Sequence, residues 1–411
     1  GAQLLSPYKV IDLADDRGAF CGKILADLGA DVIKVEPPWG DPARRIGPFF
    51  NDQPDMESSL FWQAYASSKR GVTIDFETTR GQAILRRLAE KSDFFIESFR
   101  PGYLEQLGLG YEDLKQINPT LIYVSVSAFG QRGPYRTHEA TDLTGSALGG
   151  FMWLTGDEDR PPIRVSSPQF WLLGSATAAS GAMIAHHARL KSGMGQYVDV
   201  SCQQSMARTL SQAPWFWDME RTILRRSGPY RPVGEGRKLR INFACEDGFV
   251  NFILPGGSIA ARSMEALTRW MADEGEANEL LARTNFSQYG FGQWPDSVMD
   301  ELDNALTRFF APRTKRYLAE AALERRVLLF PVNDPADIFS YPQLAARGYF
   351  REIENPSGSM VKTLGPWIRA TKSPLVAPTR APRLGEHTDQ VLLSDGFDSA
   401  EINELRSIGI I

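Results

Sequence analysis

The sequence predicts an α/β fold with a mainly parallel sheet, joined to a second and smaller α+β domain. From residue 9 to about residue 201, short apolar runs typical of buried strands alternate with stretches typical of helices. Beyond a segment rich in glycine, proline and charge, 225–238, strands around a turn are followed by amphipathic helices. The chain has 411 residues, of which 43% are hydrophobic and 23% charged, so it can bury a sizeable core and form two or three domains.

A strand–helix–strand crossover begins the chain. Two runs dense in Val, Ile and Leu, 9–14 and 31–36, predict buried parallel strands. The helix predicted between them, 18–28, is followed by Gly29, the residue that most often ends a helix. Short turns join the three elements, as in a βαβ unit.

The same alternation continues through the first half of the chain. The predicted elements are strand 72–76, helix 79–91, strand 93–98, a helical stretch to Asn118, strand 121–128, helix 142–148, helix 170–190 and strand 197–201. A loop rich in glycine, proline and polar residues, GQRGPYRTHEA (130–140), interrupts the series.

The pattern changes at RRSGPYRPVGEGRK (225–238), where apolar periodicity gives way to turn residues and charge. Beyond it, the predicted elements are strands 239–245 and 248–254, followed by helices 259–274, 300–310 and 314–326. We therefore expect three segments: a large domain over 1–224, a small α+β domain over 225–330, and a C-terminal segment 331–411 that is rich in turns and ends in helix 399–407.

Charge and composition exclude several classes of protein. The net charge of −5 offers no electrostatic reason to expect nucleic acid or an anionic membrane as a partner. No stretch approaches the roughly 18 to 20 apolar residues that span a bilayer, and the first residues do not resemble a signal peptide. The three cysteines are far apart and predict free thiols. A cytoplasmic location is the simplest expectation.

Single residues do not reveal a catalytic centre. His186 and His187 are neighbours on one predicted helix and point to different faces, so they cannot chelate together, and no metal site is expected. The aromatic run Trp215, Phe216 and Trp217 fits a pocket for an apolar or aromatic substrate, or else an interface or the core.

Six segments carry a family resemblance. They are KILADLGADVIKVEPPWGDPAR (23–44), SSKRGVTIDF (67–76), ESFRPGYLEQLGLGYEDLKQINPTLIYVSVSAFGQRGPY (97–135), DLTGSALGGFMWLTG (142–156), KSGMGQYVDVS (191–201) and FPVNDPADIFSYPQLAARGYF (330–350). In order and spacing they resemble the class III CoA-transferases, the family that contains formyl-CoA, carnitine and benzylsuccinate CoA-transferases.

The resemblance implies a large Rossmann-like domain with a parallel sheet, built from both chain ends, with the small domain inserted between them. It also implies a dimer whose two subunits thread through each other as interlocked rings. Enzymes of the family move CoA between carboxylates. An aspartate attacks the donor thioester to form a mixed anhydride and then an aspartyl-CoA thioester. CoA thioesters are therefore the expected substrates, with no tightly bound cofactor.

The aspartate nucleophile is missing from the matching position. The family pattern around it reads approximately PVRVGVPIGD, and the corresponding segment here is PIRVSSPQFW (162–171). Trp171 occupies the place of the aspartate, and an indole cannot form an acyl anhydride. Asp142 is the fallback candidate for a relocated nucleophile, although a role at the start of a helix fits it well and is favoured.

The resemblance also implies contacts to CoA. Lys69 matches a basic residue near the CoA phosphates, Arg17 matches a residue lining the active site, and Gln106 stands where some members carry a phosphate-binding arginine. The segment that contacts adenosine and pantetheine corresponds to Glu97, Ser98, Phe99 and Arg100. A solvated surface charge is the alternative interpretation of each basic residue.

We therefore expect a subunit that lacks the nucleophile and pairs, as a heterodimer or heterotetramer, with a homologous catalytic subunit. Benzylsuccinate CoA-transferase of anaerobic toluene breakdown, built from two different family members, is the precedent, so transfer from succinyl-CoA to benzylsuccinate or a similar aryl-succinate is one possible reaction. Two alternatives remain open. One is an active homodimer, either a transferase or an acyl-CoA racemase, that uses a displaced acid. The other is a protein that binds acyl-CoA without chemistry.

Overall fold

The computed structural model describes residues 3–234, 236–355, 357–375 and 377–411, so Glu235 of the predicted boundary segment lies outside the described residues. Its contacts divide the chain into two compact units. The first comprises the chain up to Met152, Arg164–Ile223 and Pro342–Ile411; the second comprises Trp153–Ile163 and Leu224–Tyr341. The domain assignment 1–224, 225–330 and 331–411 stays a prediction.

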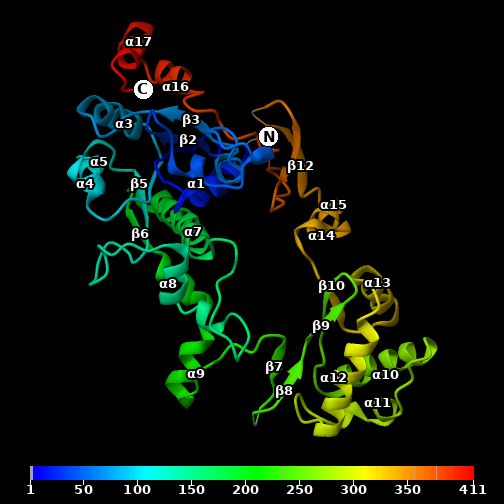
Figure 1. Ribbon diagram of the computed structural model, residues 1–411. Helices are drawn as coiled ribbons and strands as arrows, with labels where there is room; N and C mark the ends of the chain where they lie inside the picture. Colours follow the sequence, from blue (N-terminus) through cyan, green and yellow to red (C-terminus); the bar gives the residue numbers. More distant parts are fainter. Residues whose placement is uncertain (1–2, 235, 356, 376) are drawn as a thin grey trace. The chain divides into compact units, whose positions relative to one another are not determined.

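A six-stranded parallel sheet forms the centre of the first unit, which confirms the predicted α/β fold (Figure 1). Its strands stand in the order β3-β2-β1-β4-β5-β6, the order of the Rossmann fold. Their bounds are β1 (Lys9–Asp12), β2 (Asp31–Glu36), β3 (Arg70–Thr73), β4 (Phe94–Glu97), β5 (Ile122–Ser127) and β6 (Tyr197–Ser201).

Both faces of the sheet are covered, which explains why its central strands are apolar without alternation. All residues of β4 and β5 are buried. Neighbouring side chains on one strand enter different cores: Val10 and Phe94 pack with residues of α1 (Ala19–Asp27) and α7 (Gln169–Ser192), while Ile11 and Phe95 pack with residues of α3 (Thr79–Glu90) and α5 (Tyr111–Ile117).

The first unit contains further short helices. Their bounds are α2 (Leu60–Ala66), α4 (Tyr103–Gln106), α6 (Asp142–Leu148), α8 (Cys202–Thr209), α9 (Gln212–Glu220), α15 (Pro342–Ala346), α16 (Thr388–Ser394) and α17 (Ser399–Ser407), with short 3-10 turns at Pro42–Arg45, Phe50–Asp52 and Met152–Leu154. Gly193, in the left-handed conformation at φ 72°, ends α7.

The C-terminal segment joins the first unit through helices. Val391 of α16 and Leu405 of α17 are buried in the core on the α3 side of the sheet, and the Thr388 hydroxyl accepts the Thr73 N–H at 3.0 Å. The segment also forms a hairpin, β12 (Phe350–Glu354) and β13 (Met360–Leu364). Both chain ends thus contribute to this unit, but all six strands of its parallel sheet come from residues 9–201.

The second unit has an antiparallel sheet packed against helices. Its sheet has the order β11-β10-β9, from β9 (Asn242–Cys245), β10 (Gly248–Phe252) and β11 (Leu329–Val332). Its helices are α10 (Gly257–Asp273), α11 (Glu279–Arg283), α12 (Asp296–Phe310), α13 (Lys315–Arg325) and α14 (Pro335–Ser340), with a 3-10 turn at Phe286–Gln288. Val250 and Phe252 of the sheet share a core with Trp270 and Phe309 of the helices.

One predicted strand of the second unit, 239–245, is in fact two. The first part belongs to β8 (Lys238–Arg240), which pairs with β7 (Tyr230–Pro232), and the second part is β9, which pairs with β10. The chain changes partner at Ile241, whose N–H donates to the Pro229 carbonyl at 2.9 Å. Over the described ranges, no helix combines the length and apolar character needed to cross a membrane.

Candidate active site

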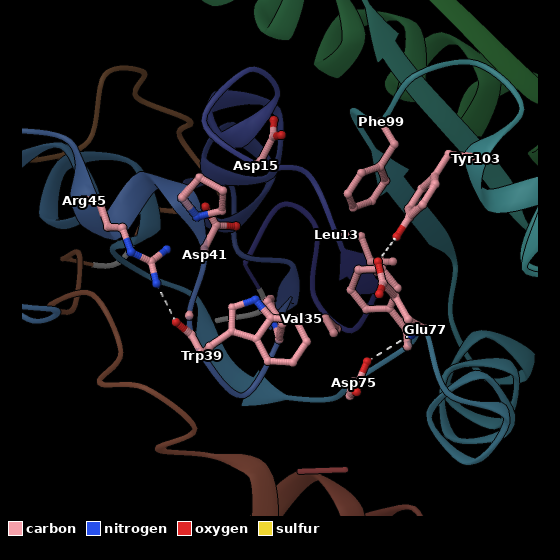
Figure 2. Close-up of a pocket in the computed structure, with 14 residues that line it drawn as sticks. Leu13, Asp15, Val35, Trp39, Asp41, Arg45, Asp75, Glu77, Phe99 and Tyr103 are labelled. Carbon is pink, nitrogen blue, oxygen red and sulfur yellow. Dashed lines mark hydrogen bonds between the residues drawn. The ribbon is translucent and has the colours of Figure 1, made fainter. Parts of the chain in front are cut away.

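A pocket of about 220 Å³ opens at the carboxyl ends of four parallel strands of the first unit. Ligands of open α/β sheets bind at this edge, next to the point where the strand order reverses, which here lies between β1 and β4. Loops that follow β1, β2, β3 and β4 supply its walls (Figure 2). The lining residues are Leu13, Asp15, Val35, Pro37, Trp39, Gly40, Asp41, Pro42, Arg45, Asp75, Phe76, Glu77, Phe99 and Tyr103.

Aromatic rings dominate the mouth of this pocket. Trp39 follows β2 and is 56% exposed, whereas Phe99 and Tyr103 follow β4 with ring centroids 5.1 Å apart. In Figure 2 the indole and this pair of rings lie on opposite sides of the pocket. Among the residues predicted to contact CoA, Phe99 is the one that lines this pocket.

The turn between β1 and α1 forms the inner corner of the site. Arg17 and Asp15 form an ion pair at 2.5 Å, and the Asp15 carboxylate also accepts the Ser98 hydroxyl at 2.8 Å. Ser98 in turn accepts the Asp15 N–H at 2.9 Å. The structure thus brings together Arg17 and Ser98 through Asp15, a residue that the sequence did not single out.

Lys69 lies beneath the corner, away from solvent. Its ammonium donates to Asp12 Oδ2 at 2.8 Å and to the Ala19 carbonyl at 2.9 Å, and both charged side chains are fully buried. Burial lowers the pKa of Lys69, while Asp12 opposes the shift. This geometry supports a structural role in holding the start of α1 against β1, and the contact to CoA phosphates stays a prediction.

Glu97 ends β4 behind the pocket and is almost completely buried. Its carboxyl group accepts the Ser125 hydroxyl and, at 2.7 Å, the Phe99 N–H. Tyr197 donates to the same Ser125 oxygen at 3.0 Å. Burial raises the pKa of Glu97 to about 8, against the lowering effect of these hydrogen bonds. Glu97 therefore acts on the pocket through the backbone of Phe99.

Arg100 and Gln106 lie at the surface. Both are exposed, Arg100 directly after Phe99 and Gln106 in the last position of α4. Neither is among the residues that line the pocket. Their predicted contacts to CoA stay untested, and Gln106 brings no positive charge to a phosphate.

Trp171 lies in the first turn of α7, with 7% of its surface exposed. Its ring meets that of Phe170 edge-on, with centroids 4.8 Å apart. A Cβ at Gly145 of α6 would lie 2.4 Å from the Phe170 ring, so the two helices pack closely here. One turn further along α7, the Ser175 hydroxyl donates to the Arg17 carbonyl at 3.1 Å. Trp171 thus lies on the helix that abuts the inner corner.

Asp142 caps the helix that carries Trp171. The predicted role at a helix start is present, but the helix is α7 rather than its own α6, because Oδ1 accepts the Phe170 N–H at 3.0 Å. Oδ2 accepts from the Arg164 guanidinium at 3.3 Å. Pro168, which precedes α7, makes no side-chain cap of its own. Both carboxylate oxygens of Asp142 are therefore engaged.

A buried charge network beneath the pocket was not predicted from the sequence. Lys34 pairs with Asp41 at 2.7 Å, and Glu36 pairs with Arg44 at 2.7 Å, with all four side chains buried. The sequence of β2, DVIKVE, contains an indication of this network, because charged residues at buried strand positions need partners. The network fixes the loop after β2, which supplies Trp39 to the pocket.

Asp16, half-buried beside Arg17, is another acid at the site that was not predicted from the sequence. Burial and the neighbouring charge of Asp15 raise the pKa of Asp16 to about 6. Its carboxyl group therefore holds a proton to higher pH than an ordinary aspartate does. No cluster of three or more His, Cys, Asp or Glu side chains in the described part of the chain could hold a metal ion.

Comparison with known proteins agrees over nearly the whole chain. A family model described as CoA-transferase family III matches residues 5–388. The subunit BbsE of succinyl-CoA:(R)-benzylsuccinate CoA-transferase from Thauera aromatica is 34% identical, over 100% of this chain and 98% of that protein. Succinyl-CoA–D-citramalate CoA-transferase of Chloroflexus aurantiacus is 32% identical, over 94% and 92%. A solved CAIB/BAIF family protein from Brucella suis has a TM-score of 0.82 at 30% identity, covering 96% of this chain and 100% of that one.

Proposed function

We propose, since this chain belongs to CoA-transferase family III, that it is the non-catalytic subunit of a CoA-transferase and pairs with a homologous subunit that carries the aspartate nucleophile. The family activity is the transfer of CoA from a thioester to a free carboxylate. In the proposed enzyme the partner performs the covalent steps, and this chain supplies scaffold and interface.

The observation that carries the proposal is the indole of Trp171 in the first turn of α7. The resemblance to the family assigns this position to the nucleophile, which must carry a carboxylate to form the acyl anhydride. Asp142, the fallback candidate for the nucleophile, accepts the Phe170 N–H and forms an ion pair with Arg164. Attack by this carboxylate on a thioester would have to break the cap of α7 or the pair with Arg164.

The proposed donor is succinyl-CoA. BbsE and the D-citramalate enzyme both bear succinyl-CoA in their names, and a four-carbon dicarboxylate is a substrate that these relatives share. For the acceptor we propose benzylsuccinate or a similar aryl-succinate, because BbsE, which matches over the full chain, is named for it.

A partner subunit would cover the apolar side chains of α9. Trp215, Trp217 and Met219 are 66%, 50% and 72% exposed, and Ile223, just beyond the helix, is 52% exposed. Exposed aromatic and apolar groups so close together are typical of protein interfaces. This favours the interface alternative for the aromatic run, and we propose that the partner contacts it in the interlocked arrangement of the family. The cytoplasmic location belongs to the same proposal.

The residues predicted to contact CoA differ in how close they lie to the pocket. Phe99 lies where it could touch a nucleotide, since it lines the pocket. Arg17, Ser98 and Glu97 act through the turn and the backbone that shape the pocket. Lys69, Arg100 and Gln106 have no place on its wall. We therefore assign the productive CoA site to the partner.

The test is expression of this chain alone, expression of its catalytic homologue alone, and co-expression of both, each assayed for CoA transfer from succinyl-CoA to benzylsuccinate. We expect a stable complex with activity, and no transfer by this chain alone. Transfer by this chain alone would favour an active homodimer with a displaced acid. CoA binding without turnover in every combination would favour an acyl-CoA-binding protein.

A further inference from the structure

The pocket at the carboxyl ends of β1 to β4 has aromatic rings on two of its sides. Trp39 forms one side, and Phe99 with Tyr103 forms the other (Figure 2). The volume of about 220 Å³ exceeds the roughly 150 Å³ of a cavity that holds benzene. It therefore has room for a nucleobase with part of its sugar, and aromatic side chains favour such a ring by stacking.

The rim of the pocket next to Tyr103 is acidic. Asp75 Oδ1 accepts the Glu77 N–H at 3.2 Å, and Glu77 Oε1 accepts the Tyr103 hydroxyl at 2.6 Å. Neither Asp75 nor Glu77 belongs to an ion pair in the part of the chain that the structure describes. Burial, followed by the hydrogen bond and charge of Glu77 and the charge of Asp75, raises the pKa of Tyr103 to about 12.

The other acids on the pocket wall are neutralised from behind. Asp15 pairs with Arg17 at 2.5 Å, and Asp41 pairs with Lys34 at 2.7 Å. The basic residue on the wall is Arg45, which is exposed and donates to the Trp39 carbonyl at 2.8 Å. The rim thus presents two carboxylates that belong to no ion pair in the described chain. The cations nearby are two exposed guanidiniums, Arg45 on the wall and Arg100, whose charge acts on Tyr103.

We propose that this pocket selects a nucleoside with free ribose hydroxyls and discriminates against the 3′-phosphate of coenzyme A. Carboxylates at the ends of parallel strands accept hydrogen bonds from ribose hydroxyls, as in dinucleotide-binding folds. A phosphate monoester carries about −1.5 to −2 charges and is repelled by the same groups. Two neighbouring acids, Asp75 and Glu77, make that repulsion a property of the site.

This nucleoside site rests on the proposed function for one point only, the class of ligand that reaches the pocket. A subunit that lacks a nucleophile and also holds CoA weakly leaves this substrate to its partner. The pocket of this chain then serves as a selective nucleoside site, separate from the transfer reaction.

Titration calorimetry of the full chain with CoA and with dephospho-CoA tests the inference. We expect dephospho-CoA to bind on the order of tenfold more tightly at low ionic strength, and the ratio to shrink as added salt screens the carboxylates. CoA binding as tight as that of dephospho-CoA would overturn the proposal. Failure of both ligands to bind would overturn it too, since no nucleoside would then occupy the pocket.

Two variants make the test specific. Glu77→Gln keeps an acceptor for Tyr103 but removes a charge. We therefore expect the affinity for CoA to rise most of the way to that for dephospho-CoA, while the affinity for dephospho-CoA changes little. Glu352→Gln, on the exposed strand β12 and outside the pocket, is the matched control and should leave the ratio unchanged. An unchanged ratio in Glu77→Gln contradicts the proposal. CoA transfer by this chain alone would contradict the proposed function without altering the ratio.

Discussion

Trp171 is a buried ring in the first turn of α7, and under the proposed function its contribution is one of packing. We predict that Trp171→Phe leaves the transfer rate of the assembled enzyme unchanged, because no step needs an indole. The substitution should cost less unfolding free energy than Trp171→Ala, which should cost about 3–5 kcal/mol through the cavity it leaves. Urea unfolding and steady-state rates check both. A large loss of rate in Trp171→Phe at normal stability would give the ring a role in the reaction.

Lys69 was expected at the CoA phosphates, but its ammonium lies in a buried pair with Asp12. We predict that Lys69→Met destabilises the protein by about 3–5 kcal/mol, because it leaves the Asp12 carboxylate buried and unpaired. The double variant Asp12→Asn, Lys69→Met should recover part of that loss. Lys115→Met, on the exposed side of α5, should change stability by less than about 0.5 kcal/mol. Normal stability of Lys69→Met together with weakened CoA binding would restore the phosphate role.

Glu97 makes stability depend on pH. Burial raises the pKa of Glu97 from 4.5 to about 8, so the folded protein keeps a proton that the unfolded chain releases between these values. The contribution to stability is therefore complete below about pH 4.5 and is lost as pH rises towards 8. We predict that Glu97→Gln, which mimics the protonated form, removes this loss.

The measurement for Glu97 is the free energy of unfolding in denaturant at pH 5 and pH 8. From pH 5 to pH 8, the free energy of unfolding of Glu97→Gln should rise relative to that of the wild-type protein. Glu352→Gln, exposed on β12, should follow the wild type. Parallel pH profiles for Glu97→Gln and the wild type would mean that the carboxyl group is ionised in the folded state throughout this range.

At the scale of elements, α7 depends on a cap from another helix. Asp142 accepts the Phe170 N–H and pairs with Arg164. We predict that Asp142→Ala costs about 1 kcal/mol of stability, that Asp142→Asn costs less because its amide oxygen still caps α7, and that both keep CoA transfer in the assembled enzyme. Abolished transfer in a folded Asp142→Asn variant would identify a relocated nucleophile.

Regular elements with a local signal were predictable from the sequence. Strand 31–36, helix 142–148 and strand 197–201 match β2, α6 and β6, because apolar runs and a threonine cap with its capping box define their limits. Strand 239–245 was wrong, since the change of partner at Ile241 depends on a distant residue, Pro229. The hairpin β12–β13 was not predicted, and its exposed, alternating residues give little apolar signal.

The candidate site was predictable only in part, because residues that are distant in the sequence form it. Phe99 was found, but Trp39 and Asp15, which share the pocket with it, were not. They come from loops after different strands and meet only at the edge of the sheet. The sequence likewise shows the charged residues under the pocket, but it does not show which of them pair with one another.

At the scale of the whole molecule, we propose that the reactive carboxylate lies on another chain. Covalent trapping in the assembled enzyme tests it most directly. The complex is incubated with succinyl-CoA, the acyl intermediates are trapped with hydroxylamine or borohydride, and the modified residue is located by mass spectrometry of both subunits. We expect modification of an aspartate of the partner and none of this chain. An adduct on Asp142, Asp16 or any other acid of this chain would contradict it.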